Sequence, residues 1–424
     1  MAVGSSGPAR ILKALRNPNY GVYTAGNAVS LVGTWTQRVA VGWLAWQLTE
    51  SGAWLGAVAF ADLFPTVIVG PIGGAFADRS DRIRLIKISQ ALACLQAVAL
   101  FLLTFTGLIT PELLLGLTLF LGIVAAFNQP ARLALIPSLV PREDLPAAVA
   151  VNSLIFNLAR FVGPMVAGLA ILAGGVETAF AINACTFIAF VVALSYMSVP
   201  FEFDSGRPKR SVLTDLKEAL DYTVGHPGIG PLMLLLIAVN LGSRPLVELL
   251  PGFAAQVFSG GAGALAVMTS TIGVGAIVGG LWLAQRPSEQ GMTVALFHTT
   301  LVQVAALGLF LATTDLWVGI AALAIVGFCW VVNGSGVQTL FQLRVDPKIR
   351  GRVLSLYGLI NRGGPAIGAL AMGTASEAVG LRWPLAAGAL LVLAAWAWIR
   401  VRGQSIAGAL EVAPPDKQPA PGED

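Results

Sequence analysis

Long apolar runs alternate with short polar segments along the chain. Most runs reach about 20 residues, which as a helix rising 1.5 Å per residue crosses a hydrocarbon core of roughly 30 Å. The pattern predicts an all-α polytopic membrane protein with twelve transmembrane helices. These helices are Tyr20–Leu48, Trp54–Ala77, Leu85–Thr106, Leu113–Leu139, Leu145–Ala173, Thr178–Val199, Pro231–Phe258, Leu265–Ala284, Thr293–Thr313, Leu316–Leu343, Val353–Ala375 and Pro384–Ile399.

A hydrophilic stretch between the sixth and seventh runs divides the helices into two sets of six. The predicted parts are a cytoplasmic amino-terminal arm (1–18), a six-helix bundle (19–200), a cytoplasmic linker (201–230), a second six-helix bundle (231–402) and a disordered cytoplasmic tail (403–424). Between Val212 and Thr223 the linker's apolar residues recur at helical spacing, which indicates an amphipathic helix on the membrane surface. A solvated linker with one helical patch fits the pattern equally well.

The composition agrees with a membrane protein. Hydrophobic residues make up 56% of the chain, charged residues 11%, and the mean hydropathy is +0.78, whereas a soluble domain carries about 25% charged residues. The net charge of +4 would suit a nucleic acid partner, but the basic residues are spread over short loops rather than gathered in one domain. We therefore predict the lipid bilayer as surroundings and no nucleic acid partner.

The distribution of positive charge predicts the orientation. Of the 26 basic residues, 21 lie in the amino-terminal arm, in the loops after the second, fourth, sixth, eighth and tenth helices, in the adjoining helix ends or at the carboxyl end. Arg38, Arg160, Arg244 and Arg362 lie within helices, and Arg382 alone falls on the opposite side. Lys and Arg collect in cytoplasmic loops. With an even number of helices, both termini are then predicted in the cytoplasm, and the chain is expected to lie in a bacterial inner membrane.

Residue types that serve metals or catalysis are sparse. Cys94, Cys185 and Cys329 each sit in an apolar run without metal-ligand spacing, and His226 and His298 stand apart. We predict no metal site, no cofactor and, in the absence of a Walker motif, no ATP hydrolysis. A membrane enzyme or lipid scramblase would need a catalytic constellation or a lipid-wide groove, and a non-transporting sensor would more often carry a soluble domain. A transporter is the preferred class.

The two sets of six helices carry related sequences. The second helix closes with Gly73-Gly74-Ala75-Phe76-Ala77-Asp78-Arg79-Ser80, and the eighth closes with a degraded copy, Gly279-Gly280-Leu281-Trp282-Leu283-Ala284-Gln285-Arg286-Pro287-Ser288. The fifth helix contains Arg160-Phe161-Val162-Gly163-Pro164, and the eleventh contains Arg362-Gly363-Gly364-Pro365. Parallel halves of this kind place a substrate path on the axis between them.

Two motifs carry a family resemblance. The loop Gly74-x-x-x-Asp78-Arg79-x-Asp81-Arg82-x-Arg84 resembles the loop 2–3 motif of the major facilitator superfamily, and Asp81 in place of the usual glycine is similar to the drug:proton antiporter branch that includes the enterobactin exporters. The fifth helix adds Ala159-x-x-x-Gly163-Pro164-x-x-Ala167-Gly168, which resembles the Gly-Pro motif of proton-coupled antiporters, with Ala167 where a glycine is common. The resemblance covers about residues 10–402.

This resemblance implies the major facilitator fold and a monomeric secondary active transporter. Its expected partners are protons and a small organic substrate, drug-like or siderophore-like, which it would export by alternating access. An importer or uniporter on the same fold is the alternative, because the direction rests on the motif of the fifth helix alone.

The resemblance also assigns a cytoplasmic gate. Asp78 is expected to meet the amino end of the eleventh helix, where unpaired amides favour an anion, and so to shift the balance between conformational states. The charges could instead only follow the distribution of positive charge across the membrane. Gly70 and Gly74 share a helix face and are expected to admit a close neighbour. The gate motif consists of Gly74, Asp78, Arg79, Asp81, Arg82 and Arg84.

Ionisable residues within membrane helices are costly, so each is a functional candidate. Asp62 is the first candidate for proton coupling and Glu248 the second, since apolar surroundings disfavour a charged carboxyl group. A fixed salt bridge to Arg38, at similar depth, would instead keep Asp62 ionised. Arg244 and Glu248 are four residues apart and are predicted to pair. The candidates for the substrate cavity are Arg38, Arg160, Arg244, Arg362, Asn157 and Asn361.

Overall fold

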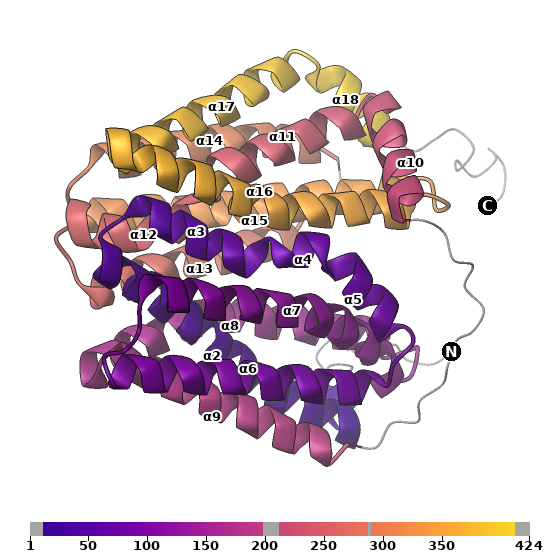
Figure 1. The fold of residues 1–424 in the computed structure, drawn as a ribbon. Coiled ribbons are helices and arrows are strands. Elements are labelled where there is room, and N and C mark those ends of the chain that lie inside the picture. The colour runs from indigo at the N-terminus through magenta and orange to yellow at the C-terminus, as the bar shows by residue number, and fades with distance from the viewer. Residues whose placement is uncertain (1–11, 198–211, 287–289, 412–424) are drawn as a thin grey trace. The chain divides into compact units, whose positions relative to one another are not determined.

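The computed structural model describes residues 12–197, 212–286 and 290–411, and within these ranges the chain forms helices and turns without a strand (Figure 1). The helices are α2 (Pro18–Thr49), α3 (Gly52–Leu63), α4 (Pro65–Ile68), α5 (Gly70–Ala77), α6 (Arg82–Phe105), α7 (Pro111–Leu139), α8 (Leu145–Gly174), α9 (Val176–Ser195), α10 (Val212–Gly225), α11 (Ile229–Gly242), α12 (Leu246–Gly252), the π-helical turn η1 (Phe253–Val257), α13 (Ala262–Ala284), α14 (Met292–Ala312), α15 (Leu316–Arg344), α16 (Arg350–Val379), α17 (Arg382–Arg400) and α18 (Gly403–Leu410).

In the part of the chain that the structure describes, nine helical spans are long and apolar enough to cross a membrane, and the bent segment from α3 to α5 makes a tenth. The helices α2 and α16, with 32 and 30 residues, correspond to the two further spans that the sequence predicts. Polar residues lower the hydropathy of α2, but Asn27, Thr36 and Gln37 are buried in the protein rather than exposed to lipid. The described helices are therefore consistent with the predicted twelve.

Two predicted helices are interrupted in the structure. The second predicted helix bends by 49° between Gly52–Ile68 and Gly70–Ala77, and it also has a break at Phe64, directly before Pro65. The seventh is interrupted at residues 243–245, where Pro245 precedes α12. Proline removes a backbone donor and clashes with the preceding turn, so both breaks have a local cause. They place Asp62 in the last turn of α3 and Arg244 between α11 and α12.

The chain divides into two compact units, which we describe separately. Unit 1 comprises Met1–Pro208, Leu246–Gly273 and Ala369–Leu381, and unit 2 comprises Lys209–Pro245, Val274–Gly368 and Arg382–Asp424. In unit 1, α2 packs against α8 and α9, and α6 packs against α7 and α9. In unit 2, α14 packs against α15 and α17, and α11 packs against α17. The boundaries of the two predicted six-helix bundles stay a prediction.

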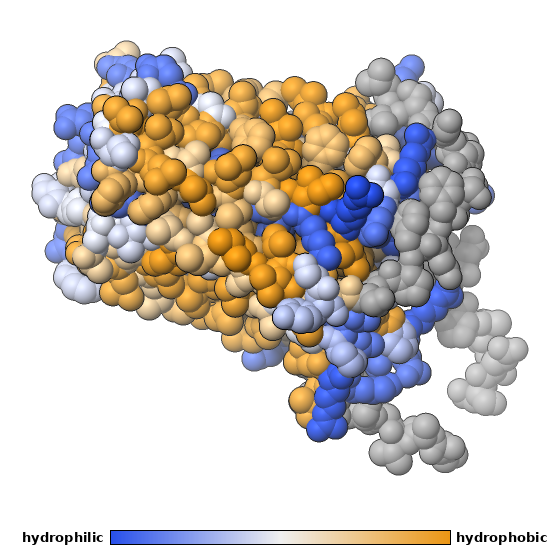
Figure 2. Space-filling view, turned by 60° about the horizontal axis from the view of Figure 1, so that its bottom comes forward, coloured by the Kyte–Doolittle hydropathy of each residue, from blue (hydrophilic) through white to orange (hydrophobic). Residues whose placement is uncertain are grey.

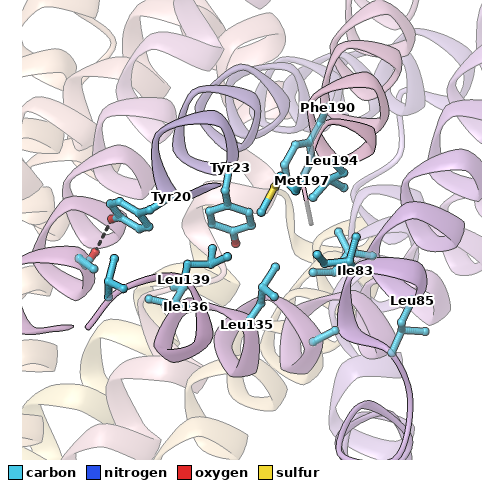
Figure 3. Packing of buried hydrophobic residues seen from close by; sticks show 14 of the residues in the cluster. Tyr20, Tyr23, Ile83, Leu85, Leu135, Ile136, Leu139, Phe190, Leu194 and Met197 are labelled. Carbon is cyan, nitrogen blue, oxygen red and sulfur yellow. Dashed lines mark hydrogen bonds between the residues drawn. The ribbon is translucent and has the colours of Figure 1, made fainter. Parts of the chain in front are cut away.

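A buried apolar cluster in unit 1 fixes the helices that flank the predicted gate loop (Figure 3). Tyr23 of α2 meets Phe190 of α9 edge to face, with ring centroids 5.8 Å apart. Ile83 of α6 and Leu135 of α7 complete this contact between four helices. The Tyr20 hydroxyl donates to the carbonyl of Ala148 at 2.9 Å (Figure 3). The gate motif therefore starts and ends on packed helices.

The linker contains the predicted helix. Ala219 and Thr223 of α10 are buried, and α10 packs against α11, so this helix rests on protein (Figure 1). Arg352, at the start of α16, pairs with Asp215 at 2.9 Å and with Glu218 at 2.6 Å. The structure therefore shows a helix at Val212–Gly225, and its place on the membrane surface stays a prediction. Residues 201–211 of the predicted linker lie outside the described residues.

The prediction of a disordered tail from Gly403 is wrong for its first part, which forms α18. Leu410 is fully buried, and the Arg344 Nε donates to its carbonyl at 2.7 Å. The Glu411 carboxylate accepts from the amides of Gly291 at 2.7 Å and Thr293 at 2.6 Å, so it caps α14, which has no side-chain cap of its own. Residues 412–424 of the predicted tail lie outside the described residues.

The surface is suited to a lipid environment. Side chains on the face in Figure 2 are mainly hydrophobic, and hydrophilic side chains gather toward the helix ends. On α8, Leu169 and Leu172 are 67% and 72% exposed. Exposed leucines along a long apolar helix have a favourable partner in hydrocarbon but not in water. The arrangement agrees with helices that cross a bilayer.

Candidate functional site

Three charged side chains in unit 1 form an ion cluster. The Arg38 Nη2 lies 2.8 Å from Glu248 Oε1 and 3.5 Å from Asp62 Oδ2. The side chains of Arg38, Asp62 and Glu248 are 29%, 27% and 16% exposed, so all three are mostly removed from water. The structure pairs Arg38 with Asp62 as the sequence suggested and adds Glu248, so one guanidinium faces two carboxylates.

The predicted pair between Arg244 and Glu248 is wrong. A spacing of four brings side chains together only on a continuous helix, and the helix is interrupted at residues 243–245. Glu248 instead bonds Arg38, and the guanidinium of Arg244 lies against Trp330.

Trp35 joins two of the predicted arginines. The guanidinium carbons of Arg38 and Arg160 lie 5.4 Å and 5.7 Å from its ring centroid, within the range of cation–π contacts. A Cβ at Gly163 would collide with the Cβ of Trp35, and the Thr36 hydroxyl donates to the Gly163 carbonyl at 3.1 Å. The first glycine of the motif in the fifth helix therefore lets α8 approach α2 and hold Trp35 in place.

The second glycine of that motif also serves close packing. A Cβ at Gly168 would lie 2.5 Å from the Cβ of Ala266 on α13. Pro164 stands inside α8, which continues through it. The motif thus positions α8 against two neighbouring helices, and its described contacts are with protein.

A buried polar network precedes Arg38. The Gln37 side chain donates to Gln96 at 2.9 Å and accepts from Asn183 at 2.8 Å. The three side chains are 2%, 1% and 0% exposed. Since buried polar groups need partners, these bonds fix α2 against α6 and α9 at the depth of the ion cluster.

Arg244 of unit 2 has different surroundings. Its guanidinium carbon lies 5.0 Å from the Trp330 ring centroid, and its Nη2 donates to the Trp330 carbonyl at 3.4 Å. Among the described residues its buried Nε has no acceptor, and no carboxylate forms an ion pair with it. A Cβ at Gly334 would lie 3.6 Å from both Arg244 Nη2 and the Tyr357 hydroxyl. Arg244, Trp330 and Tyr357 therefore meet at Gly334.

A second polar network holds Trp330. Its indole N–H and the Gln303 amide both donate to the Ser243 hydroxyl, each at 3.0 Å. Asn333 donates to Gln303 at 3.1 Å and accepts from Thr299 at 2.6 Å. Trp330, Ser243 and Gln303 are 1%, 0% and 0% exposed, so the ring beside Arg244 is fixed from behind.

The other predicted cavity residues are less engaged. Asn157 and Asn361 each donate to the carbonyl four residues earlier in their own helix, at 2.8 Å and 3.0 Å. Arg362 is partly buried on α16, and the structure records no hydrogen bond or ion pair for it within the described ranges. The described residues therefore bring Asp62 and Glu248 to Arg38, place Arg38 and Arg160 on Trp35, and place Arg244 on Trp330.

The gate motif has a structural component. The Asp81 carboxylate caps α6 by accepting from the amides of Ile83 at 2.9 Å and Arg84 at 3.2 Å, which gives a reason for an acid in place of the usual glycine. Arg82 donates to the Ala134 carbonyl at 3.0 Å and the Ser138 hydroxyl at 3.1 Å, joining the loop to α7.

Asp78 and Arg79 are exposed at the end of α5, and their predicted gate role stays a prediction. The predicted close approach through Gly70 and Gly74 is wrong. The nearest atom to a Cβ at Gly74 would be 4.0 Å away, and a Cβ at Gly70 would meet nothing within 4 Å. Gly73, on another face of α5, is the close contact, because its Cβ would collide with the Ala126 carbonyl of α7.

Arg132 is a partly buried arginine that the sequence pattern predicts among the cytoplasmic basic residues. It lies within α7, where Nη1 donates to Asn27 at 2.8 Å and the guanidinium carbon stands 4.9 Å from the Phe190 ring centroid. Its buried Nε and the buried Tyr23 hydroxyl have no hydrogen-bond partner in the described part of the chain. The available signal was its position seven residues before Leu139, well inside an apolar run.

Long apolar helices, interrupted at two sites that carry charged residues, define a polytopic membrane protein of the secondary transporter class. The structure is similar to a bacterial homologue of the human lysosomal transporter Spinster, with a TM-score of 0.73 and 14% identity over 94% of this chain and 99% of that one. It is also similar to the nucleoside transporter NupG, with a TM-score of 0.66 and 13% identity over 93% and 100% of the two chains. These similarities confirm the predicted major facilitator fold.

The chain belongs to the transmembrane secretion effector family of major facilitator transporters, whose family model matches residues 11–421. Among its relatives is the staphyloferrin A transporter of Staphylococcus aureus, 25% identical over 82% of this chain and 87% of the relative. Another is the enterobactin exporter EntS of Escherichia coli, 27% identical over 77% of this chain and 76% of the relative. The predicted superfamily and branch are confirmed.

Proposed function

We propose that this transporter exports a small organic compound of siderophore type across a bacterial inner membrane in exchange for protons. The names of the two relatives support this class of substrate, and that of EntS supports the direction. Both termini would lie in the cytoplasm, as the basic loops favour, and the chain would act as a monomer.

The ion cluster is the observation that supports proton coupling. With both carboxylates ionised, Arg38, Asp62 and Glu248 carry a net charge of minus one, and uptake of one proton would make the cluster neutral. Asp62 is the preferred proton acceptor, because it is more exposed than Glu248 and farther from the guanidinium. Two carboxylates that face the same guanidinium repel each other, and this repulsion favours the uptake of a proton by one of them.

The cluster could also couple protonation to the conformational change of transport. Arg38 and Asp62 come from the first six predicted helices, and Glu248 comes from the seventh. Protonation of either carboxylate would weaken a contact between segments of the two sequence halves. Transport by alternating access requires such contacts to form and break. Asp78 and its neighbouring arginines would serve the same purpose at the cytoplasmic face.

The first test is transport into everted membrane vesicles from Escherichia coli cells that lack EntS. Respiration acidifies the vesicle interior, so an exporter that exchanges protons should accumulate added staphyloferrin A, a siderophore that carries carboxylate groups, and nigericin should abolish the accumulation by collapsing the pH gradient. The double variant Asp62→Asn, Glu248→Gln should lose the gradient dependence, because no carboxylate remains in the cluster. Glu143→Gln, which removes an exposed carboxylate paired with Lys13, is the matched control and should behave like the wild type.

Uptake that stops at equal concentrations on both sides of the membrane and that nigericin leaves unchanged would indicate a uniporter. Accumulation in intact cells rather than in everted vesicles would indicate an importer. Gradient-driven export by the double variant would remove the ion cluster from the proton path while leaving the direction of transport intact.

A further inference from the structure

Arg244 is a cation within the membrane whose anion is missing from its described surroundings. It stands 15 residues after the start of the 29-residue span Ile229–Val257, close to its middle. The carbonyl of Trp330 is a single neutral acceptor, and the buried Nε has none within the described residues. A charged group in this position is costly unless an anion or a polar partner compensates it.

The surroundings of Arg244 are built rather than incidental. The network through Ser243 and Gln303 fixes the Trp330 ring, and the ring fixes the guanidinium by a cation–π contact. The side chains that position this one arginine are all buried, and they are Ser243, Thr299, Gln303, Trp330 and Asn333. A preorganised guanidinium loses little conformational entropy when it binds a ligand.

Tyr357 adds a hydroxyl at the same position. It donates to the Gly334 carbonyl at 2.9 Å, which orients its oxygen beside the Arg244 Nη2. Gly334 keeps this space open, because a Cβ there would already be in contact with both groups. The phenol ring is held edge to face against Phe341, with centroids 6.4 Å apart.

The interrupted helix supports a binding site at this position. In transporters, discontinuous membrane helices supply substrate sites near the middle of the bilayer, because the helix ends expose polar groups there. The interruption at residues 243–245 falls directly on Arg244. Irregular backbone at membrane depth is tolerated where protein or a cavity covers it.

We propose that Arg244, Trp330 and Tyr357 form a subsite for the carboxylate group of an organic substrate, with an apolar or aromatic part of the substrate against Trp330. The inference rests on the proposed function, since it names the chemical group by which the exported compound is held. A guanidinium presents a planar fork of donors that matches the two oxygens of a carboxylate. The buried Nε would supply one of these donors, and the Tyr357 hydroxyl would turn its proton from the Gly334 carbonyl to the bound group.

Arg38 is not suited to this task, because Asp62 and Glu248 already compensate its charge. Arg286 provides a matched control, because it lies 5.2 Å from the Trp282 ring centroid in unit 2 and donates to the Gln290 carbonyl at 3.1 Å. It thus reproduces the arginine–tryptophan contact without the buried network.

The test uses the purified full-length protein in detergent, with benzoate as the probe and benzamide as its uncharged counterpart. Benzoate should raise the midpoint of thermal unfolding in a saturable manner, and benzamide should not. Arg244→Gln should weaken benzoate binding by about tenfold or more, since it removes a charged donor pair. Arg286→Gln should bind benzoate like the wild type.

A second variant guards against a folding defect in Arg244→Gln. Gly334→Leu retains the arginine but would fill the space between Nη2 and the Tyr357 hydroxyl, so it should also abolish the benzoate shift, whereas Gly334→Ala should largely retain it. The proposal is overturned if benzoate stabilises Arg244→Gln and Gly334→Leu as it does the wild type, if benzamide acts as well as benzoate, or if benzoate has no effect on the wild type.

The binding test and the transport test can each reject one proposal without rejecting the other. Benzoate binding that depends on Arg244, together with absent proton-driven export, would retain the subsite and reject the proposed function. Proton-driven export of staphyloferrin A with no benzoate binding would retain the function and reject the subsite.

Discussion

Arg38 and Arg244 have similar structural surroundings but different neighbouring charges. Each arginine belongs to the first span of its sequence half and lies on a tryptophan ring. Each follows a buried polar residue that bonds a buried glutamine of the third span of its half. In unit 1 these residues are Gln37 and Gln96, and in unit 2 they are Ser243 and Gln303.

The two sites differ in their counter-charges. Asp62 and Glu248 face Arg38, whereas Arg244 has no acidic partner among the described residues. Since the supporting networks are alike, packing does not cause this difference. A common scaffold thus carries an excess of negative charge at one site and an uncompensated positive charge at the other, as separate proton and anion sites would require.

The largest expected difference is in the effect of removing each arginine on stability. Arg38→Gln leaves two mostly buried carboxylates without a cation and should lower the free energy of unfolding by about 2–4 kcal/mol, somewhat less than for a fully buried pair. Arg244→Gln removes an uncompensated cation and should cost less than about 1 kcal/mol or stabilise the protein. Thermal unfolding of both variants in one detergent measures the difference.

The same comparison has an internal control. The double variant Arg38→Gln, Glu248→Gln replaces one of the two unpaired carboxylates by an uncharged amide, so part of the lost stability should return. Equal losses for Arg38→Gln and Arg244→Gln would mean that the carboxylates do not distinguish the two sites.

The sequence predicted the spans far better than the two sites. Hydropathy placed the fifth helix at Leu145–Ala173, and α8 covers Leu145–Gly174, because lipid selects for continuous apolar runs. The breaks were missed although Pro65 and Pro245 are visible, since proline is tolerated within membrane helices and does not by itself specify an interruption. Overlooking the second break led directly to the wrong partner for Glu248.

Other site residues leave no distinct pattern in the sequence. Trp330 and Tyr357 stand in apolar runs, where an aromatic residue that supports an arginine looks like any core residue. Asp62 and Arg38 could be singled out, because an ionisable residue in a membrane helix is rare. Glu248 could be singled out for the same reason, but it is distant in sequence, and only the tertiary contacts reveal that it pairs with Arg38.

A smaller effect is expected from the network behind Trp330. Ser243→Ala leaves the indole N–H of Trp330 and the amide of Gln303 without their buried acceptor, which should cost about 1–2 kcal/mol of stability. Benzoate binding should weaken as well, because Trp330 would no longer be fixed beside Arg244. Ser355→Ala is the control, since Ser355 is exposed and bonds only its own helix. Unchanged stability and binding in Ser243→Ala would show that the network does not position the tryptophan.

The smallest expected effect concerns the helix starts. Asn17 caps α2 by accepting from the Tyr20 amide at 3.2 Å, whereas His226 Nδ1 accepts from the amides of Gly228 at 3.1 Å and Ile229 at 3.2 Å at the start of α11. Asn17 does not titrate, but His226 can accept these bonds only while its Nδ1 is unprotonated. The two corresponding helices should therefore respond differently to acid.

Burial lowers the pKa of His226 below its usual value of about 6.5. Above that value the imidazole is neutral in the folded and unfolded states, and its contribution to stability is complete. As the pH falls through the lowered pKa, the unfolded state binds the proton more readily, so stability is lost. His226→Asn keeps a side-chain acceptor that does not titrate, and the wild type should lose up to about 1 kcal/mol more than this variant between pH 7.5 and 5.5. Parallel unfolding curves for the two proteins over this range would assign the acid response to other groups.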